Sequence, residues 1–320
     1  MKLFVIGGSG YVGTEVCTRL LADGHELTGL ARTERSVQHF RSMGITPVRG
    51  SMDDAGVIAE QSELADGVVQ MWLGGALTNA LTTGESTVRT SQVILDTLRG
   101  SNKLYLWTSG VGVWLDTGLL DPDREVTEKD PISPPYFYEH LGRIMKMMLG
   151  EQEVRTAIIA PGQVYGHRGG CAGPTVRLFD SFREHGAIYG IEGTGNAISH
   201  VHVEDLADLY SLVVSEPKAR GVYFGVSDTV PHMDLAVGIS NAVGLDGNVE
   251  IVNPGSIREL NGRFAELDWI WNLRASSERA RKELGWRPSR PGILEEMANL
   301  PQPLDLTKVY PSRRRAPLIV

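Results

Sequence analysis

Three glycines near the N-terminus have the spacing of a phosphate-binding loop. They follow the short apolar run of residues 3–6 and precede a helical pattern. Such a turn lets the backbone approach a pyrophosphate closely and directs the free N–H groups of the helix start at the anion. A turn that serves packing alone is the alternative, but the place between strand and helix favours a dinucleotide. We therefore predict cofactor contacts from Gly7, Ser9, Gly10, Tyr11, Val12 and Gly13.

The end of the second expected strand favours NADP(H) over NAD(H). A carboxylate there binds the ribose 2′-hydroxyl of NAD(H), whereas an arginine accommodates the 2′-phosphate of NADP(H). Here Arg32 stands at the tip of the strand and Arg35 follows it. The alternative for Arg32 is an exposed arginine without a ligand.

Strands and helices must alternate to position these residues, and the hydrophobic periodicity predicts that they do. Short apolar runs at residues 3–6, 27–30, 46–48, 68–73, 104–107 and 156–159 alternate with helical patterns at 11–23, 33–43, 55–64, 85–98 and 141–149. Strict alternation predicts an α/β fold with a doubly wound, Rossmann-type parallel sheet.

After this part the regular alternation of strand and helix patterns ends. Long loops with one short helix near residues 176–182 are expected over 166–198, and a largely helical stretch over 231–300. We assign residues 1–165, joined by 199–229, to a dinucleotide-binding domain. Residues 166–198 and 230–320 then form a smaller, mostly helical substrate-binding region.

Composition excludes several classes of protein. The 320 residues are 42% hydrophobic and carry a net charge of −8, which argues against a nucleic-acid partner. The first apolar run is too short for a signal peptide or a membrane span. Two cysteines cannot build a disulfide framework. We expect a cytoplasmic protein that acts on a small molecule, without a membrane partner.

Six motifs along the chain occur in an order that is specific for one superfamily. After the glycine loop come Gly50-Ser51-Met52-Asp53-Asp54, Trp107-Thr108-Ser109-Gly110, Ala160-Pro161-Gly162-Gln163-Val164-Tyr165-Gly166, His200-Val201-His202-Val203-Glu204-Asp205-Leu206-Ala207 and Leu284-Gly285-Trp286-Arg287-Pro288. In this order the sequence resembles the extended or atypical branch of the short-chain dehydrogenase/reductase superfamily, the NAD-dependent epimerase/dehydratase-like proteins.

The resemblance implies further cofactor contacts. Ser51 and Met52 stand in the turn that contacts adenine in the family. Trp72 and Leu73 end the fourth strand, where the family usually keeps alanines close to the cofactor ribose. A tryptophan that turns into the core is the alternative for Trp72.

The resemblance also implies a catalytic pair. In the superfamily a tyrosine is the general acid/base, a lysine four residues later lowers its pKa, and a Ser or Thr orients the substrate carbonyl. Tyr138 and Ser109 take the first and third positions, but Gly142 stands where the lysine is expected. Tyr138 is therefore either a working acid or an aromatic residue that lines the pocket.

Three histidines are candidate metal ligands, but their spacing does not predict a metal site. His167, His200 and His202 have no carboxylate at ligand spacing in the sequence. Asp205 is expected to cap the helix that follows it.

The leading functional hypothesis is an NADP(H)-dependent reductase of a small carbonyl or unsaturated compound. The alternatives are an epimerase or dehydratase that retains its nucleotide, and a non-catalytic NADP(H)-binding sensor or scaffold. A homodimer through the helices at 85–98 and 141–149 is expected by analogy with the superfamily.

Overall fold

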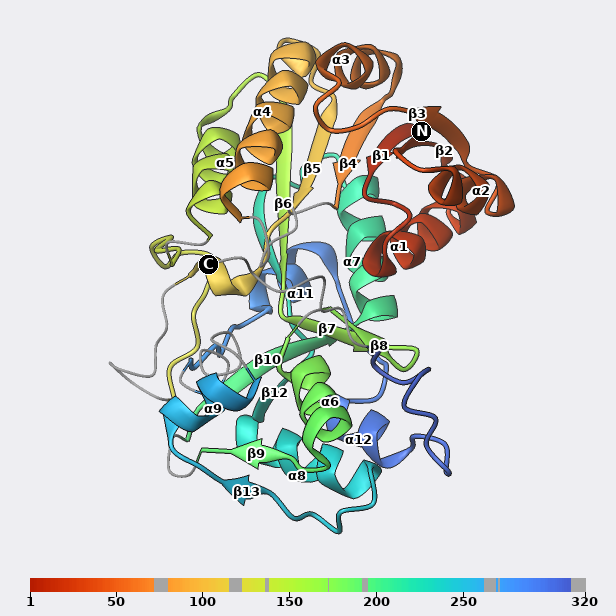
Figure 1. Cartoon of the computed structure of the whole chain (residues 1–320). Coiled ribbons are helices and arrows are strands. Elements are labelled where there is room, and N and C mark those ends of the chain that lie inside the picture. The colour runs from red at the N-terminus through yellow and green to blue at the C-terminus, as the bar shows by residue number, and fades with distance from the viewer. Residues whose placement is uncertain are drawn as a thin grey trace.

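A seven-stranded parallel sheet forms the centre of the larger part of the molecule (Figure 1). The computed structural model describes residues 1–71, 80–114, 123–135, 138–171, 173–191, 195–261, 269 and 271–311. The strand order is β11-β6-β5-β4-β1-β2-β3. The strands are β1 (Lys2–Ile6), β2 (Glu26–Ala31), β3 (Thr46–Arg49), β4 (Gly67–Gln70), β5 (Leu104–Thr108), β6 (Arg155–Pro161) and β11 (Gly221–Gly225).

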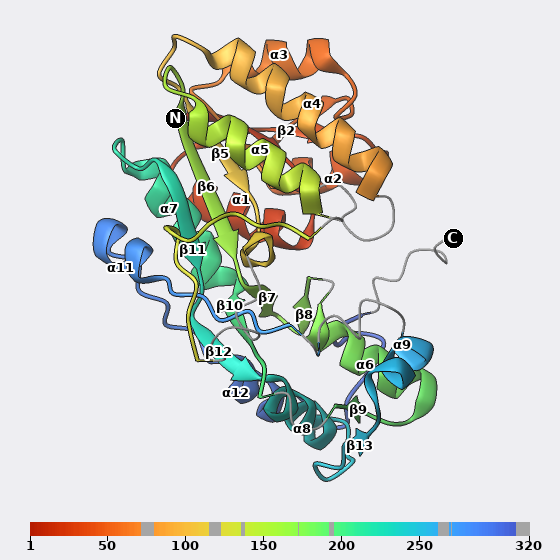
Figure 2. The same ribbon diagram turned by 90° about the vertical axis from the view of Figure 1, so that its left-hand side faces the viewer.

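Helices cover both faces of this sheet because each strand is followed by a crossover (Figure 2). One face packs against α1 (Tyr11–Ala22), α2 (Glu34–Ser42) and α7 (Val203–Ser215). The other face packs against α3 (Ala55–Leu64), α4 (Ala80–Leu98) and α5 (Glu139–Gly150). The predicted doubly wound fold is confirmed. None of the helices in the described ranges is long and apolar enough to cross a membrane.

The smaller part of the molecule contains a second sheet that the sequence did not reveal. Its order is β12-β10-β7-β8, and a separate pair joins β9 to β13. The strands are β7 (Gln163–Gly166), β8 (Gly169–Gly170), β9 (Tyr189–Gly190), β10 (Ala197–His202), β12 (Asp228–Pro231) and β13 (Glu250–Ile251). Strands of two residues have no readable periodicity, so the loops expected over 166–198 proved partly wrong.

Four helices pack around a third apolar core beside this second sheet. They are α6 (Pro174–His185), α8 (His232–Ala242), α9 (Pro254–Asn261) and α12 (Ile293–Ala298). Helix α11 (Glu278–Leu284) instead lies with the first sheet, as the packing of Ala280 into that core shows. A single turn of 3-10 helix, η1 (Val111–Val113), follows β5.

Two motifs that are far apart in the sequence meet at the start of α7. The carboxylate of Asp205 accepts hydrogen bonds from the backbone N–H groups of Ser289 (2.9 Å) and Arg290 (3.1 Å). The indole N–H of Trp286 donates to the backbone carbonyl of Asp205 at 2.8 Å. The expected cap was therefore wrong: Nδ1 of His202 accepts from the N–H of Glu204, and Asp205 anchors a distant loop.

Candidate functional site

The glycine loop lies between β1 and α1, with each glycine in a different steric situation. Gly7 has a φ of +87°, which disfavours any residue with a side chain, and the N–H of Gly10 donates to its carbonyl at 3.1 Å. A Cβ at Gly13 would lie 2.2 Å from the Gly7 oxygen, so Gly13 is needed for packing. A Cβ at Gly10 would meet only that oxygen, at 3.4 Å, which is ordinary contact. The protein itself therefore does not require glycine at position 10.

The first turn of α1 has the electrostatic character of an anion site. Gly10 is its N-cap, no side chain caps the helix, and no acidic residue lies in the first turn. The positive end of the helix dipole and the backbone N–H groups of this first turn therefore suit a phosphate.

The other predicted loop residues have different surroundings. The Ser9 side chain is exposed at the loop, with its Oγ 3.4 Å from Oγ of Ser36. The Tyr11 hydroxyl reaches the β7–β8 hairpin, where the carbonyl oxygens of Gly166 and Gly169 lie at 2.9 and 3.1 Å. Val12 packs against the apolar core. Through Tyr11 the loop is tied to the second sheet.

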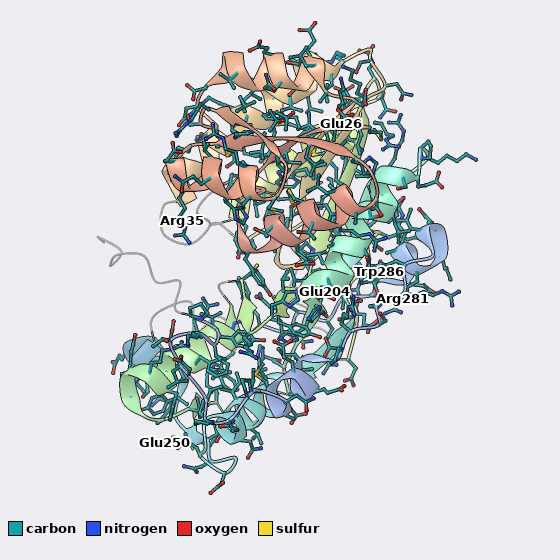
Figure 3. All side chains as sticks on the ribbon, turned by 90° about the vertical axis from the view of Figure 1, so that its right-hand side faces the viewer. Glu26, Arg35, Glu204, Glu250, Arg281 and Trp286 are labelled. Carbon is teal, nitrogen blue, oxygen red and sulfur yellow. The ribbon has the colours of Figure 1, made fainter. Side chains whose placement is uncertain are left out.

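Arg32 and Arg35 stand beside this loop at the end of β2 and the start of α2. Both side chains are exposed, and neither forms a hydrogen bond or ion pair with any residue in the described ranges. Figure 3 shows Arg35 at the edge of the larger part that faces the smaller one. The acid between them, Glu34, is paired with Arg49 on the neighbouring strand β3. Two guanidinium groups are thus unneutralised where a 2′-phosphate is expected.

The turn after β3 places Ser51 and Met52 at the same edge of the sheet. The N–H of Ser51 donates to the Asp54 carboxylate at 2.6 Å, and the Met52 carbonyl accepts from the Thr90 hydroxyl at 2.8 Å. The turn is therefore held both internally and by α4. Trp72 and Leu73 lie outside the described residues.

Ser109 follows β5 directly and is completely buried. Its N–H donates to the carbonyl of Ile159 at 2.8 Å, and its hydroxyl lies 3.4 Å from Sδ of Met145 on α5. The strand end and the position of Ser109 agree with the expectation, but the hydroxyl faces a helix. Contact with a substrate requires another side-chain rotamer of Ser109.

Tyr138 is the N-cap residue of α5, and its N–H donates to the carbonyl of Pro135 at 2.8 Å. Its ring lies beside Gly112, since a Cβ at that glycine would be 3.5 Å from the ring carbon Cε2. One turn later Gly142 is buried against Pro134. The segment after β5 and the start of α5 therefore meet at Tyr138.

The sequence profile of the NAD dependent epimerase/dehydratase family matches residues 3–224. The chain belongs to this family. Membership agrees with the glycine loop, the strand order and the motif order described above, and it does not specify a reaction.

One sequence relative and two solved structures of similar fold extend over most of this chain. An uncharacterized protein of Saccharomyces cerevisiae is 28% identical over 304 residues, which cover 93% of this chain and 98% of the relative. The structure of human epimerase family protein SDR39U1 with NADPH has a TM-score of 0.69 at 19% identity and covers 94% of this chain and 100% of that one. The structure of a double mutant of the dTDP-glucose 4,6-dehydratase DesIV from Streptomyces venezuelae, with NAD bound, has a TM-score of 0.71 at 20% identity. It covers 91% of this chain and 92% of that one.

One cluster that the sequence did not connect lies next to the loop. Glu15 of α1, His167 of the β7–β8 turn and Glu204 of α7 bring their polar atoms together. Positions 15, 167 and 204 share no spacing that a sequence pattern detects. No carboxylate lies at ligand spacing to His167 in the sequence, but the fold brings Glu15 and Glu204 to it.

Proposed function

We propose that this protein is an NADP(H)-dependent oxidoreductase that reduces a small organic carbonyl or unsaturated compound. The observation that carries the cofactor preference is the pair of exposed arginines, Arg32 and Arg35, beside the glycine loop. The only acid between them is Glu34, and its carboxylate is paired with Arg49 on β3.

The glycine loop and the first turn of α1 would hold the pyrophosphate. The absence of a side chain at Gly10 would let the pyrophosphate approach the backbone, and the start of α1 would supply N–H donors. Ser51 and Met52 would lie beside the adenine. The nicotinamide supplies the hydride when it is bound, and the protein has to place the substrate and manage the proton.

Tyr138 is the proposed proton donor. Its ring stands where η1 and the start of α5 meet, beside Gly112. Ser109 is the proposed partner that orients the substrate after a change of rotamer. In the proposed reduction the phenol would give its proton to the substrate carbonyl oxygen as hydride reaches the carbonyl carbon.

A second candidate function rests on Gly142 and Pro134. Pro134 fills the space beside position 142, where the superfamily has the lysine that lowers the pKa of the tyrosine. The lysine that lowers the pKa of the tyrosine in the superfamily is therefore absent from this position. This favours a protein that binds NADP(H) without turnover, as a sensor or scaffold.

Cofactor titration tests the proposal. We expect intrinsic tryptophan fluorescence to respond to NADPH at micromolar concentration and to NADH at least about tenfold more weakly. Arg32→Ala removes one cation. It should abolish this difference, mainly by lowering the affinity for NADPH. Arg41→Ala, which changes an exposed arginine at the far end of α2, is the matched control. Equal affinity for both nucleotides in the unmodified protein would refute the NADP(H) preference.

Reduction needs a separate measurement. A panel of small aldehydes, ketones and enones should reveal consumption of NADPH. Binding of NADPH without consumption across the panel would support the non-catalytic candidate.

A further inference from the structure

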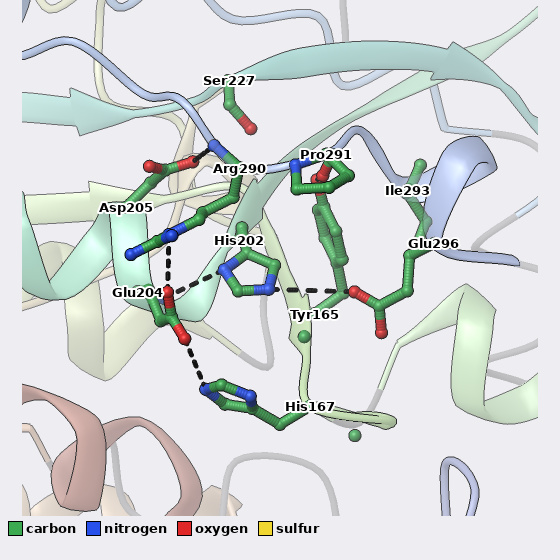
Figure 4. Close-up of polar contacts among 12 residues, drawn as sticks. Tyr165, His167, His202, Glu204, Asp205, Ser227, Arg290, Pro291, Ile293 and Glu296 are labelled. Carbon is green, nitrogen blue, oxygen red and sulfur yellow. Dashed lines mark hydrogen bonds and ion pairs between the residues drawn. The ribbon is translucent and has the colours of Figure 1, made fainter. Parts of the chain in front are cut away.

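Three side chains, from α1, α7 and the β7–β8 turn, converge at one point. Figure 4 shows two of them, His167 and Glu204, directed at each other. Nε2 of His167 lies 3.4 Å from Oε2 of Glu15 and 3.1 Å from Oε1 of Glu204. The three atoms all lie within 4.8 Å of one another, the only such group of three found in the described part of the chain. Long-range folding, and not a local turn, creates this arrangement.

Hydrogen bonds from His167 cannot satisfy both carboxylates well. Both carboxylates approach the same nitrogen of His167, and one nitrogen carries a single hydrogen, which it can share between two acceptors only in a bent, weak arrangement. The two negative charges also lie close to each other. A cation at the centre of the group would satisfy all three atoms together.

We propose that Glu15, His167 and Glu204 form a binding site for a divalent transition-metal ion of the zinc class. Metal–ligand bonds of 2.0–2.2 Å in tetrahedral geometry separate neighbouring ligand atoms by about 3.3 Å. The two measured separations, 3.1 and 3.4 Å, agree with this value. Imidazole nitrogen and carboxylate oxygen are both ligands that Zn²⁺ accepts in proteins. About half of the His167 side chain is exposed, so water can complete the coordination.

Neighbouring groups hold the ligands in place. Nε of Arg290 contacts the other carboxylate oxygen of Glu204, Oε2, at 2.5 Å, which leaves Oε1 directed at His167. Arg290 is itself fixed through its N–H, which donates to Asp205. Partners of this kind orient ligands in known metal sites.

The site would fasten the β7–β8 hairpin to the larger sheet. Glu15 and Glu204 lie on α1 and α7, whereas His167 lies in the hairpin turn. Tyr11 already joins the same hairpin to α1 through Gly166 and Gly169. Zinc binding should therefore stabilise the junction between the two parts. This proposal does not depend on the dinucleotide.

Calorimetric titration of the chelator-treated, full-length protein with zinc chloride tests the site. We expect one ion per chain with a Kd of about 10 µM or tighter. His167→Ala and Glu15→Gln should each weaken binding by about tenfold or more. Glu15→Gln keeps an acceptor for His167 but removes the charged ligand, so a folding defect does not confuse the result. His185→Ala is the control, because His185 has one neighbouring carboxylate, Glu184, at 3.9 Å.

Thermal unfolding with and without zinc supplies a second readout. If the metal binds, zinc should raise the Tm near pH 7.5, and the shift should shrink at lower pH because protons compete for the imidazole. Absence of saturable binding below about 100 µM would overturn the proposal. So would equal zinc affinity in the unmodified protein, His167→Ala and Glu15→Gln.

Discussion

The ring of Pro134 occupies the space next to the Cα of Gly142. A Cβ added at Gly142 would lie 2.7 Å from Cγ of Pro134, closer than non-bonded carbon atoms approach. Gly142 is buried on α5, one turn after Tyr138. The lysine that the superfamily places here therefore cannot be introduced without moving the segment that contains Pro134.

We expect Gly142→Ala to destabilise the protein by about 1–3 kcal/mol, because the added methyl group overpacks the site. An alanine in a helix is otherwise favoured over glycine by about 0.5–1 kcal/mol, so the sign of the effect is diagnostic. Gly150→Ala in the same helix, where a Cβ meets nothing within 4 Å, is the control and should not destabilise. Chemical denaturation measures both. An unchanged stability of Gly142→Ala would show that Pro134 yields, and Gly142→Lys would then become a feasible test of Tyr138.

Gly10→Val should abolish NADPH binding and leave the fold intact. A Cβ at Gly10 makes only an ordinary contact with the Gly7 oxygen, whereas the larger side chain would stand where a pyrophosphate approaches the loop. Gly13→Ala is the contrasting variant, because its Cβ would lie 2.2 Å from that oxygen and should unfold the loop. Circular dichroism with NADPH titration separates the two effects. Unaltered affinity in Gly10→Val would mean that the loop does not bind the phosphate.

Tyr138→Phe removes only the phenol oxygen and tests the proton donor. If the reductase proposal holds, kcat should fall by about a hundredfold while the affinity for NADPH stays the same. Steady-state kinetics with direct NADPH titration distinguishes this from a pocket-lining role, which would raise KM and leave kcat nearly unchanged. A fully active Tyr138→Phe would exclude the phenol from the mechanism.

His200 should make the protein less stable in acid. The side chain is completely buried, neither ring nitrogen has a partner of ordinary geometry in the described ranges, and burial lowers its pKa from 6.5 to about 3. As the pH falls, His200 binds a proton in the unfolded chain before it does so in the folded protein. The folded protein therefore loses stability as the pH drops from 6.5 towards 3.

The expected slope from this one group is about 1.4 kcal/mol per pH unit. Denaturation of the unmodified protein and of His200→Leu between pH 7 and 4.5 isolates it from other titrating groups. The difference in unfolding free energy between them should change steadily with pH. A constant difference would show that His200 becomes protonated within the fold.

Several features of this protein follow from the sequence itself. Residues 55–64 form the helix α3 over the whole expected range, and the order of strands and helices through the first half was correct. Gly7 and Gly13 were recognisable because their steric demands arise within a few residues of chain. Local periodicity and local turns are encoded locally, so a single sequence reveals them.

Other features were decided only when distant segments came together. Sequence spacing suggested that Asp205 caps α7, but in the fold its carboxylate binds Ser289 and Arg290. The strand β9 exists only through its pairing with β13. Glu15, His167 and Glu204 become neighbours because α1, α7 and the hairpin meet. Each depends on contacts between segments that lie far apart in the sequence, which no local pattern records.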